Sequence, residues 1–314
     1  MGSFDINSFD DPPPPPKHLF KYLSVARIQN VLEQGTVRFT PLMNTNDSFE
    51  IRSTFKKFAG PRFLKMLGEQ MDIATSEANF EAMLVEKMKE FGIDGVHPQA
   101  IIQMIEAQQG GDFLQLLRIQ IQGTIDTVML PLLNDPQYAQ QLLEDFGRNL
   151  LCFSLSERAD SAPMWAHYAD NHQGFVVAFD TDHEWFKQRK DGKKNRLQKV
   201  IYFDGMVEEP LENVSASFMS KTTDWTYERE WRLYAQVDQV DAIYGSDDDP
   251  VHVVNFPADA VQRVIVGSKA TPETIESIKS VLKKKYPHAG LTKSTPNRST
   301  TSFDEVEVQG GQTA

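Results

Sequence analysis

The sequence predicts an α+β fold: a mixed, largely antiparallel sheet flanked by helices, with an all-helical insertion. Short apolar runs bounded by turn residues, at 150–153, 175–179 and 261–266, have the length of buried strands. Residues 224–235 alternate in polarity and the connection at Pro257 is short, which favours antiparallel pairing. Between these blocks, apolar residues at about 58–148 recur at helical spacing, which predicts four to six inserted helices.

The N-terminal part predicts a strand, a helix and a second strand. Residues 1–17, with prolines at 12–16, indicate a flexible tail containing a polyproline spacer. The single domain therefore starts at residue 18, with an aromatic strand over 18–23. Ser24 is the expected cap of a helix that runs to Gln34 and ends at Gly35. A strand over 37–40 and a turn at 44–48 follow.

Residues 150–180 predict the wall of a pocket. After the strand at 150–153, Ser161 is the expected helix cap, and Met164, Trp165 and Tyr168 then fall on one helix face, with His167 at its border. Gly174 is expected to end this helix before the strand at 175–179. No other stretch concentrates aromatic and imidazole groups so tightly.

The remaining elements follow from apolar runs and turn residues. We expect strands at 200–203, 251–256, 261–266 and 303–308, a short helix at 184–190, and a helix starting at Thr271-Pro272 with Ile275, Ile278 and Leu282 inward. Residues 309–314 are expected to fray, and the methionines of the helical insertion are expected to fill its core.

Composition excludes several classes of protein. The net charge of −12 argues against broad binding to nucleic-acid backbones, and the basic run at 187–199 is expected to be a solvated loop and helix end. No apolar run is long enough for a membrane span, and mean hydropathy is −0.42. The one cysteine, Cys152, is expected to pack in the core. These features together predict a cytoplasmic protein.

Two glutamates are the strongest candidates for chemistry. On a strand, Glu228 and Glu230 would share a face with Arg232, with the two carboxylates roughly 6–7 Å apart. Such a pair can hold a ribose hydroxyl, stabilise a cationic transition state or act as a base, and the alternative is a structural ladder of ion pairs. His167 and His172 are five residues apart, which does not fit a zinc site, and no metal is expected. Glycine-rich phosphate loops and nucleophile elbows are also absent from the sequence.

Several short blocks follow one another with a distinctive order and spacing: 19–22, 37–40, 46–50, 152–154, 164–169, 172–174, 225–232 and 265–267. These blocks resemble a bacterial family called domain of unknown function 2971. Ser48 stands where that family has proline, and the resemblance spans about residues 17–308 with the helical insertion as its variable part.

A strand with Phe20-Lys21-Tyr22, a helix ending at Gly35, a strand with Phe39-Thr40 and a late Glu228-x-Glu230 follow one another in the chain. This order resembles that of ADP-ribosyltransferases, which place a catalytic Glu late in a split sheet. This resemblance implies NAD as a substrate, with Glu230 binding the nicotinamide ribose and Glu228 orienting or deprotonating an unknown macromolecular acceptor. Lys21 or Tyr22 stands where those enzymes have His or Arg, and Tyr22, Trp165 or Tyr168 would stack on nicotinamide. The candidate catalytic residues are Glu230 and Glu228, and the candidate binding residues are Lys21, Tyr22, Thr40, Asn46, Asp47, Trp165, His167, Tyr168 and Arg232.

Three functions remain open from the sequence. The first is an NAD-consuming enzyme, an ADP-ribosyltransferase or glycohydrolase, used as a toxin or anti-phage effector. The second is a non-catalytic module that senses a small ligand or meets a protein partner. The third is a nuclease or hydrolase using His167, Asp170, Glu228 and Glu230. The oligomeric state is not predicted.

Overall fold

The computed structural model describes residues 13–47, 58–92, 95–109, 111–188, 192, 194–205, 210–211, 217–246, 249–300 and 302–308. The chain divides into two compact units, one of residues 1–53, 143–205 and 214–314, the other of residues 54–142 and 206–213. A large mixed sheet and several helices confirm the predicted α+β class. The tail residues 1–12 and 309–314, the motif residues 48–50 and the basic residues 189, 190 and 193 lie outside the described ranges.

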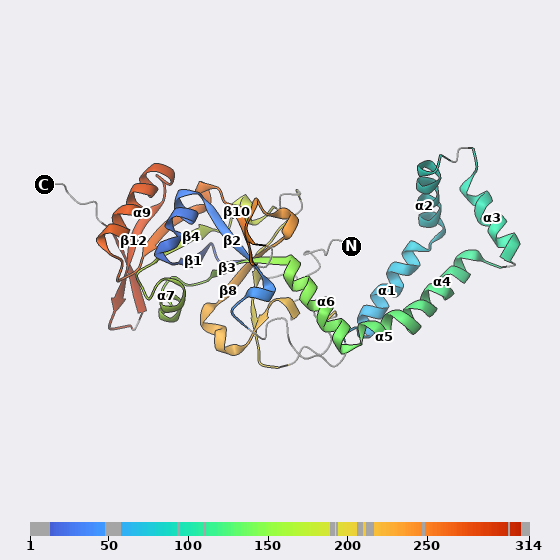
Figure 1. Cartoon of the computed structure of the whole chain (residues 1–314), viewed down its shortest axis with the longest axis horizontal. Coiled ribbons are helices and arrows are strands. Elements are labelled where there is room, and N and C mark those ends of the chain that lie inside the picture. Colours follow the sequence, from blue (N-terminus) through green and yellow to red (C-terminus); the bar gives the residue numbers. More distant parts are fainter. Residues whose placement is uncertain are drawn as a thin grey trace. The chain divides into compact units, whose positions relative to one another are not determined.

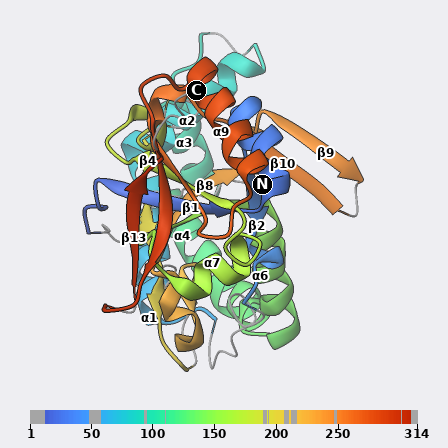
Figure 2. The same ribbon diagram turned by 90° about the vertical axis from the view of Figure 1, so that its left-hand side faces the viewer.

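The first unit contains the large sheet, in which described neighbours pair antiparallel except β11 and β12 (Figure 1). Its path runs β13-β12-β11-β4-β1-β3-β2-β10-β9, with β8 joined to β3 and β5 joined to β8. Figure 2 shows β9 and β13 at opposite margins of the sheet. The strands are β1 (His18–Leu23), β2 (Thr36–Pro41), β3 (Leu150–Ser156), β4 (Phe175–Asp180), β5 (Gln198–Lys199), β8 (Glu230–Gln236), β9 (Ala242–Ser246), β10 (Asp249–Asn255), β11 (Val261–Val266), β12 (Gly290–Asn297) and β13 (Ser302–Glu307).

Both faces of the sheet are buried at its centre. Val177 and Phe179 point to one core, which the helix α9 (Pro272–Lys285) covers with Ile278. Val176 points to the other face, where α7 (Ala162–Tyr168) packs. Strands buried on two faces consist of continuous apolar runs, which is why the sequence marks β4 and β11 so clearly.

The strands β1 and β2 diverge along β3. β1 pairs with β4 along its whole length but meets β3 at one register, Phe20 with Ser156. β2 meets the other end of β3, where Thr40 lies opposite Cys152. On its other edge β3 pairs continuously with β8. The middle of β3 therefore faces a gap between two strands, and this gap positions the candidate site.

The predicted helix after Ser24 is real but is not an α-helix. It consists of a 3₁₀ turn η2 (Val25–Arg27) and a π-helix η3 (Ile28–Glu33), and its buried residues include Ile28 and Val31 as expected. Ser24 sits at the cap position without a side-chain cap hydrogen bond. Sequence periodicity cannot separate these helix types over so short a segment, because 3₁₀, α and π turns differ by only one residue in the span of each hydrogen bond.

The predicted long strand over 224–235 is wrong in its first half. Residues Thr223–Glu228 form a 3₁₀ helix, η7, and the strand β8 begins only at Glu230. Between them Arg229 adopts a left-handed conformation with φ of 44°. Such a conformation is uncommon for a residue with a Cβ, so no local pattern announces it.

Gly174 does not end α7 as predicted. The helix ends at Tyr168, and residues 170–172 form a left-handed turn. A Cβ on Gly174 would lie 2.1 Å from the Leu23 carbonyl oxygen, so glycine is needed here for close approach of two backbones.

Several smaller elements also differ from the expectations. The predicted strand at 200–203 is shorter, as β6 (Ile201–Tyr202), and pairs parallel with β7 (Ser220–Lys221). A single 3₁₀ turn, η6 (Glu184–Phe186), stands where the helix 184–190 was expected. The 3₁₀ turn η4 (Leu42–Asn44) follows β2, and two further 3₁₀ turns, η8 (Val237–Gln239) and η9 (Ala258–Ala260), connect strands.

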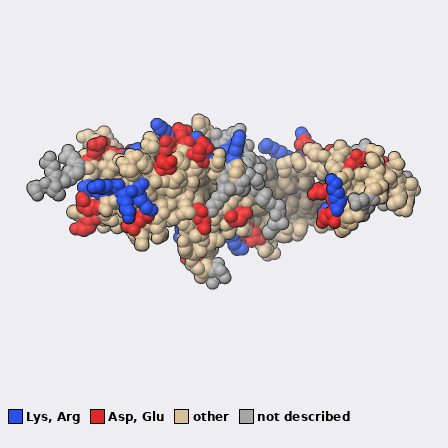
Figure 3. Space-filling model, turned by 90° about the horizontal axis from the view of Figure 1, so that it is seen from above, with Lys and Arg blue, Asp and Glu red and all other residues tan. Residues whose placement is uncertain are grey.

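The predicted helices at about 58–148 are confirmed. They are α1 (Pro61–Ala74), α2 (Glu77–Glu90), α3 (Pro98–Gln109), α4 (Phe113–Thr124), the π-helix η5 (Ile125–Met129), α5 (Leu130–Leu133) and α6 (Pro136–Asn149). The expectation that their methionines fill a core is largely wrong, because Met66, Met83 and Met104 are about half exposed and only Met88 of these four is buried. No described helix has the length and apolar character to cross a membrane. On the face shown in Figure 3, the described acidic and basic side chains lie in small separate groups.

Candidate functional site

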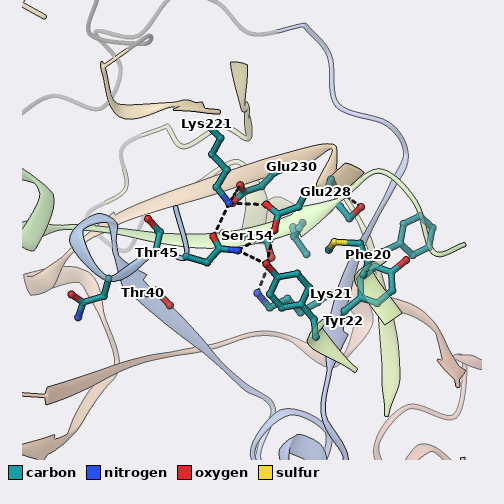
Figure 4. A pocket seen from close by; sticks show the side chains of 15 residues that line it. Phe20, Lys21, Tyr22, Thr40, Thr45, Ser154, Lys221, Glu228 and Glu230 are labelled. Atoms are coloured by element: carbon teal, nitrogen blue, oxygen red, sulfur yellow. Dashed lines mark hydrogen bonds and ion pairs between the residues drawn. The ribbon is translucent and has the colours of Figure 1, made fainter. Parts of the chain in front are cut away.

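A cavity of about 210 Å³ opens at the gap between β1 and β2 (Figure 4). The Nζ of Lys21 donates a hydrogen bond of 2.9 Å across this gap to the Ser154 carbonyl oxygen, in the middle of β3. The lining residues come from β1, β2, the segment 44–46 that follows β2, β3, α7 and the segment 220–230: Phe20, Lys21, Tyr22, Thr40, Asn44, Thr45, Asn46, Ser154, Leu155, Ser156, Met164, Tyr168, Lys221, Glu228 and Glu230.

A buried lysine joins the two glutamates. The Nζ of Lys221 lies 2.7 Å from Glu228 Oε2 and 2.8 Å from Glu230 Oε2, and all three side chains are at most 5% exposed. Figure 4 shows the ammonium group between the two carboxylates. Burial alone lowers the pKa of Lys221, but the charges of Glu230 and Glu228 outweigh it and raise that pKa above its ordinary value. Lys221 is therefore charged at neutral pH.

The two carboxylates differ in their other contacts. Both oxygens of Glu230 face the guanidinium of the fully buried Arg232, at 2.8 and 3.0 Å. The Oε1 of Glu228 accepts instead from two neutral groups, the Tyr168 hydroxyl at 2.5 Å and the Asn46 amide at 3.1 Å. The same amide contacts the Tyr168 hydroxyl. Glu230 is thus held between two cations, whereas Glu228 has one oxygen held by neutral donors that can rotate away.

The chain positions these carboxylates through backbone contacts. The left-handed Arg229 turns the chain between them, and its carbonyl oxygen accepts from the amide of Glu157. The Ser156 hydroxyl donates to the Glu228 carbonyl oxygen at 2.7 Å. The segment that carries Lys221 is fixed by Asp47, whose carboxylate accepts from the Thr222 amide at 2.9 Å.

Burial shifts the pKa values of the other groups in the cavity. It raises the pKa of Glu230, against the opposing effect of the Lys221 charge. It lowers the pKa of Lys21, although the charge of Glu230 acts in the opposite direction. Burial and the Glu228 charge both raise the pKa of the Tyr168 hydroxyl, so this group is a hydrogen-bond donor at neutral pH.

Most of the predicted site residues meet at this cavity, and four do not line it. Asp47 and Arg232 stand behind the lining and hold the Lys221 segment and Glu230. Trp165 is fully buried, and its ring packs edge-on against that of Tyr22 at 5.3 Å, so it positions a lining residue. His167 is exposed on α7. The predicted residues that line the cavity are Glu228, Glu230, Lys21, Tyr22, Thr40, Asn46 and Tyr168.

Sequence reasoning missed Lys221, the cation at the centre of the site. It lies on the two-residue strand β7, which no periodicity marks. The only available signal was indirect: two glutamates brought together in a core require a cation near them. Ser154 and Ser156 were missed as cavity residues because their strand is otherwise apolar. Within the described ranges, no group of three or more His, Cys, Asp or Glu residues is placed to hold a metal ion.

The comparisons with known proteins support one of the two resemblances. Residues 164–233, from α7 to β8, match the model of a family described as "Protein of unknown function (DUF2971)". This match contains Tyr168, Lys221, Glu228 and Glu230, so the resemblance to that family is confirmed over the segment that carries most of the polar site. No curated protein and no solved structure matches the chain. The likeness to ADP-ribosyltransferases stays a prediction.

Proposed function

We propose that this protein cleaves the bond between nicotinamide and ribose in NAD and transfers the ADP-ribosyl group to water or to a macromolecular acceptor. The observation that carries this proposal is the carboxylate of Glu228 in the gap between β1 and β2, with one oxygen held by neutral donors. Loss of nicotinamide leaves an oxocarbenium-like ribose, and a carboxylate fixed beside it stabilises the positive charge as it develops.

The contacts favour a different division of roles from the one implied by the resemblance. Glu230 is neutralised by Lys221 and Arg232 on both oxygens, so it fits a positioning residue that anchors the Lys221 ammonium. Glu228 fits the carboxylate that accepts a ribose hydroxyl, because Tyr168 and Asn46 can yield Oε1 to the substrate. The aromatic rings of Phe20, Tyr22 and Tyr168 in the lining suit a cationic nicotinamide ring.

The proposed reaction balances without a metal or redox partner. The glycosidic bond breaks, its electron pair leaves with neutral nicotinamide, and the ribose C1′ becomes electron-poor. An oxygen of water or of the acceptor then forms the new bond to C1′, and its proton passes to the Glu228 carboxylate and on to solvent. We place this activity in the cytoplasm, and a toxin or anti-phage role would act through NAD consumption.

A second candidate function is a non-catalytic ligand-binding module. The observation that favours it is that all four carboxylate oxygens of Glu228 and Glu230 already have partners. A charge network satisfied in this way suits a rigid binding wall as well as a reaction centre.

The two candidates are separated by nicotinamide release and by NAD binding, measured on the same preparations. For the enzyme, Glu228→Gln lowers kcat roughly 100-fold or more while the dissociation constant for NAD, from calorimetry, changes only a few-fold. For the binding module, NAD gives a saturable heat without nicotinamide release in any variant. Tryptophan fluorescence controls for folding, because all four tryptophans lie in the first unit.

A further inference from the structure

A second cavity, of about 470 Å³, adjoins the first. The two share the lining residues Lys21, Tyr22, Thr40 and Tyr168. The first cavity alone is smaller than the roughly 300–1,000 Å³ typical of ligand pockets, whereas the second lies within that range. A ligand of dinucleotide size therefore needs both.

Among the described residues that line the second cavity, all the charged ones are basic. Arg27, Arg38 and Lys21 contribute the charged groups, and Ser24, Asn30, Gln34, Thr36 and Thr40 contribute neutral polar ones. The positive charge of this lining is opposite in sign to the net charge of the whole chain, which is −12. A basic pocket on an acidic protein selects an anion, because the surrounding acidic surface does not retain anions elsewhere.

One wall of this cavity is built by three adjacent strands. Arg38 on β2 lies opposite Val253 on β10, and Val251, two residues earlier on the same face, lies opposite Tyr244 on β9. These four side chains consequently share a face, with the guanidinium at one end and the phenol at the other. The Tyr244 ring is 63% exposed and available for stacking.

The other wall comes from the segment 25–34. Arg27 and Asn30 lie on η2 and η3, and both line the cavity. Isolated π-helical turns occur frequently at functional sites. Arg27 is exposed, so its side chain is free to close over a ligand.

Arg38 has unused hydrogen-bonding capacity. Its Nε is buried, and among the described residues no hydrogen-bond partner reaches it. A buried donor without a partner costs free energy, which a bound anion would recover. A guanidinium is also the group best shaped to bind phosphate through two hydrogen bonds.

We propose that this second cavity binds the adenosine diphosphate half of a dinucleotide, with the diphosphate between Arg38 and Arg27 and the base against Tyr244. This inference rests on the proposed function for the identity of the ligand, since NAD would then place its nicotinamide ribose at Glu228 and its diphosphate beyond Lys21. The shared residues Lys21 and Thr40 mark the passage between the two halves.

The test is calorimetric titration with ADP-ribose, which contains the diphosphate but has no bond to nicotinamide. Wild type is expected to bind, and Arg38→Gln is expected to weaken binding roughly 10-fold or more, because it removes a charge-assisted hydrogen bond to the diphosphate. Arg38→Lys restores part of the affinity. Arg298→Gln, an exposed residue in the turn between β12 and β13, is the matched control and stays within about twofold of wild type. Arg27→Gln gives an independent reading should Arg38→Gln fail to fold.

The outcomes distinguish this inference from the proposed function. If ADP-ribose binds through Arg38 but NAD is never cleaved, the second cavity is supported and the enzymatic function is refuted. If NAD is cleaved and Arg38→Gln leaves both the KM for NAD and ADP-ribose affinity unchanged, the enzymatic function stands and this inference is overturned. Absence of ADP-ribose binding to wild type also overturns it.

Discussion

Replacing Lys221 by Met removes the buried cation that holds both glutamates. Two unit charges about 2.7 Å apart attract by about 6 kcal/mol at an effective dielectric constant of about 20. The cost of burying the ions offsets part of this attraction, but removal of one partner leaves carboxylates in the core, which costs about 3–5 kcal/mol. The Glu230 carboxylate keeps Arg232, so most of the loss is expected at Glu228.

The assay is denaturant unfolding of the first unit. Tryptophan fluorescence reports this unit alone, because residues 165, 185, 225 and 231 all belong to it. Lys221→Met is expected to lower its free energy of unfolding by about 3–5 kcal/mol. Lys284→Met, at an exposed position of α9, is the control and is expected to change it by less than about 0.5 kcal/mol.

The pH dependence identifies the cause of this loss. Without Lys221, the folded-state pKa of the Glu230 carboxyl, which burial already raises, rises further above the unfolded value of about 4.3. The folded state then holds more protons than the unfolded state between these two pKa values, so the stability of the variant falls as pH rises through that window. The free energy of unfolding of Lys221→Met therefore lies further below that of the wild type at pH 8 than at pH 5. A loss below about 1 kcal/mol, or an equal deficit at both pH values, would refute the reasoning.

Four further results are expected. Tyr168→Phe removes a donor to Glu228 and lowers kcat for nicotinamide release roughly 10-fold with unchanged fluorescence; an unchanged kcat would exclude that contact from the reaction. Because burial lowers the pKa of Lys21, the affinity for ADP-ribose falls with rising pH at a lower pH than an ordinary lysine would cause, and Lys21→Met flattens this dependence in calorimetry. The lowered pKa has the opposite effect on folding: between the folded-state pKa and 10.5 the unfolded state binds more protons, so the free energy of unfolding increases with pH. Gly174→Ala lowers the Tm measured by fluorescence by several degrees, since its Cβ meets a backbone oxygen; a Tm equal to wild type would contradict this close approach. Cys152, the only thiol, is buried with its pKa raised to about 12, so native protein resists alkylation until the first unit opens, and rapid labelling without denaturant would count against that burial.

The sequence was most informative where one physical effect dominates. The strands β1 and β11 were predicted with their observed bounds, because apolar runs of that length between turn residues have few alternatives. The strand β12 was not predicted. Its sequence GLTKSTPN is polar, and it is a strand because it pairs in parallel with β11 and antiparallel with β13. Such pairing is a property of the tertiary structure, which a local pattern does not contain.

The candidate site also combines features that a local pattern predicts with features that depend on the tertiary structure. The glutamates Glu228 and Glu230 were recognised because two carboxylates two residues apart can hold a ribose hydroxyl or act as a base, although the strand geometry expected for them was wrong. They converge through the left-handed Arg229, which is stabilised by contacts to Thr226 and Glu157 rather than by its own preference. The divergence of β1 from β2 depends on registers across more than a hundred residues and could not be predicted from either strand.

Nicotinamide release from NAD by the purified wild-type chain, beside Glu228→Gln, tests the central claim most directly. The account predicts release that is proportional to time and to protein concentration, and its near-complete loss in a variant that retains the wild-type fluorescence. Equal release by wild type and Glu228→Gln would contradict the role of this carboxylate. Absence of release, together with absence of a heat of NAD binding to the wild type, would contradict the assignment of this cavity to NAD.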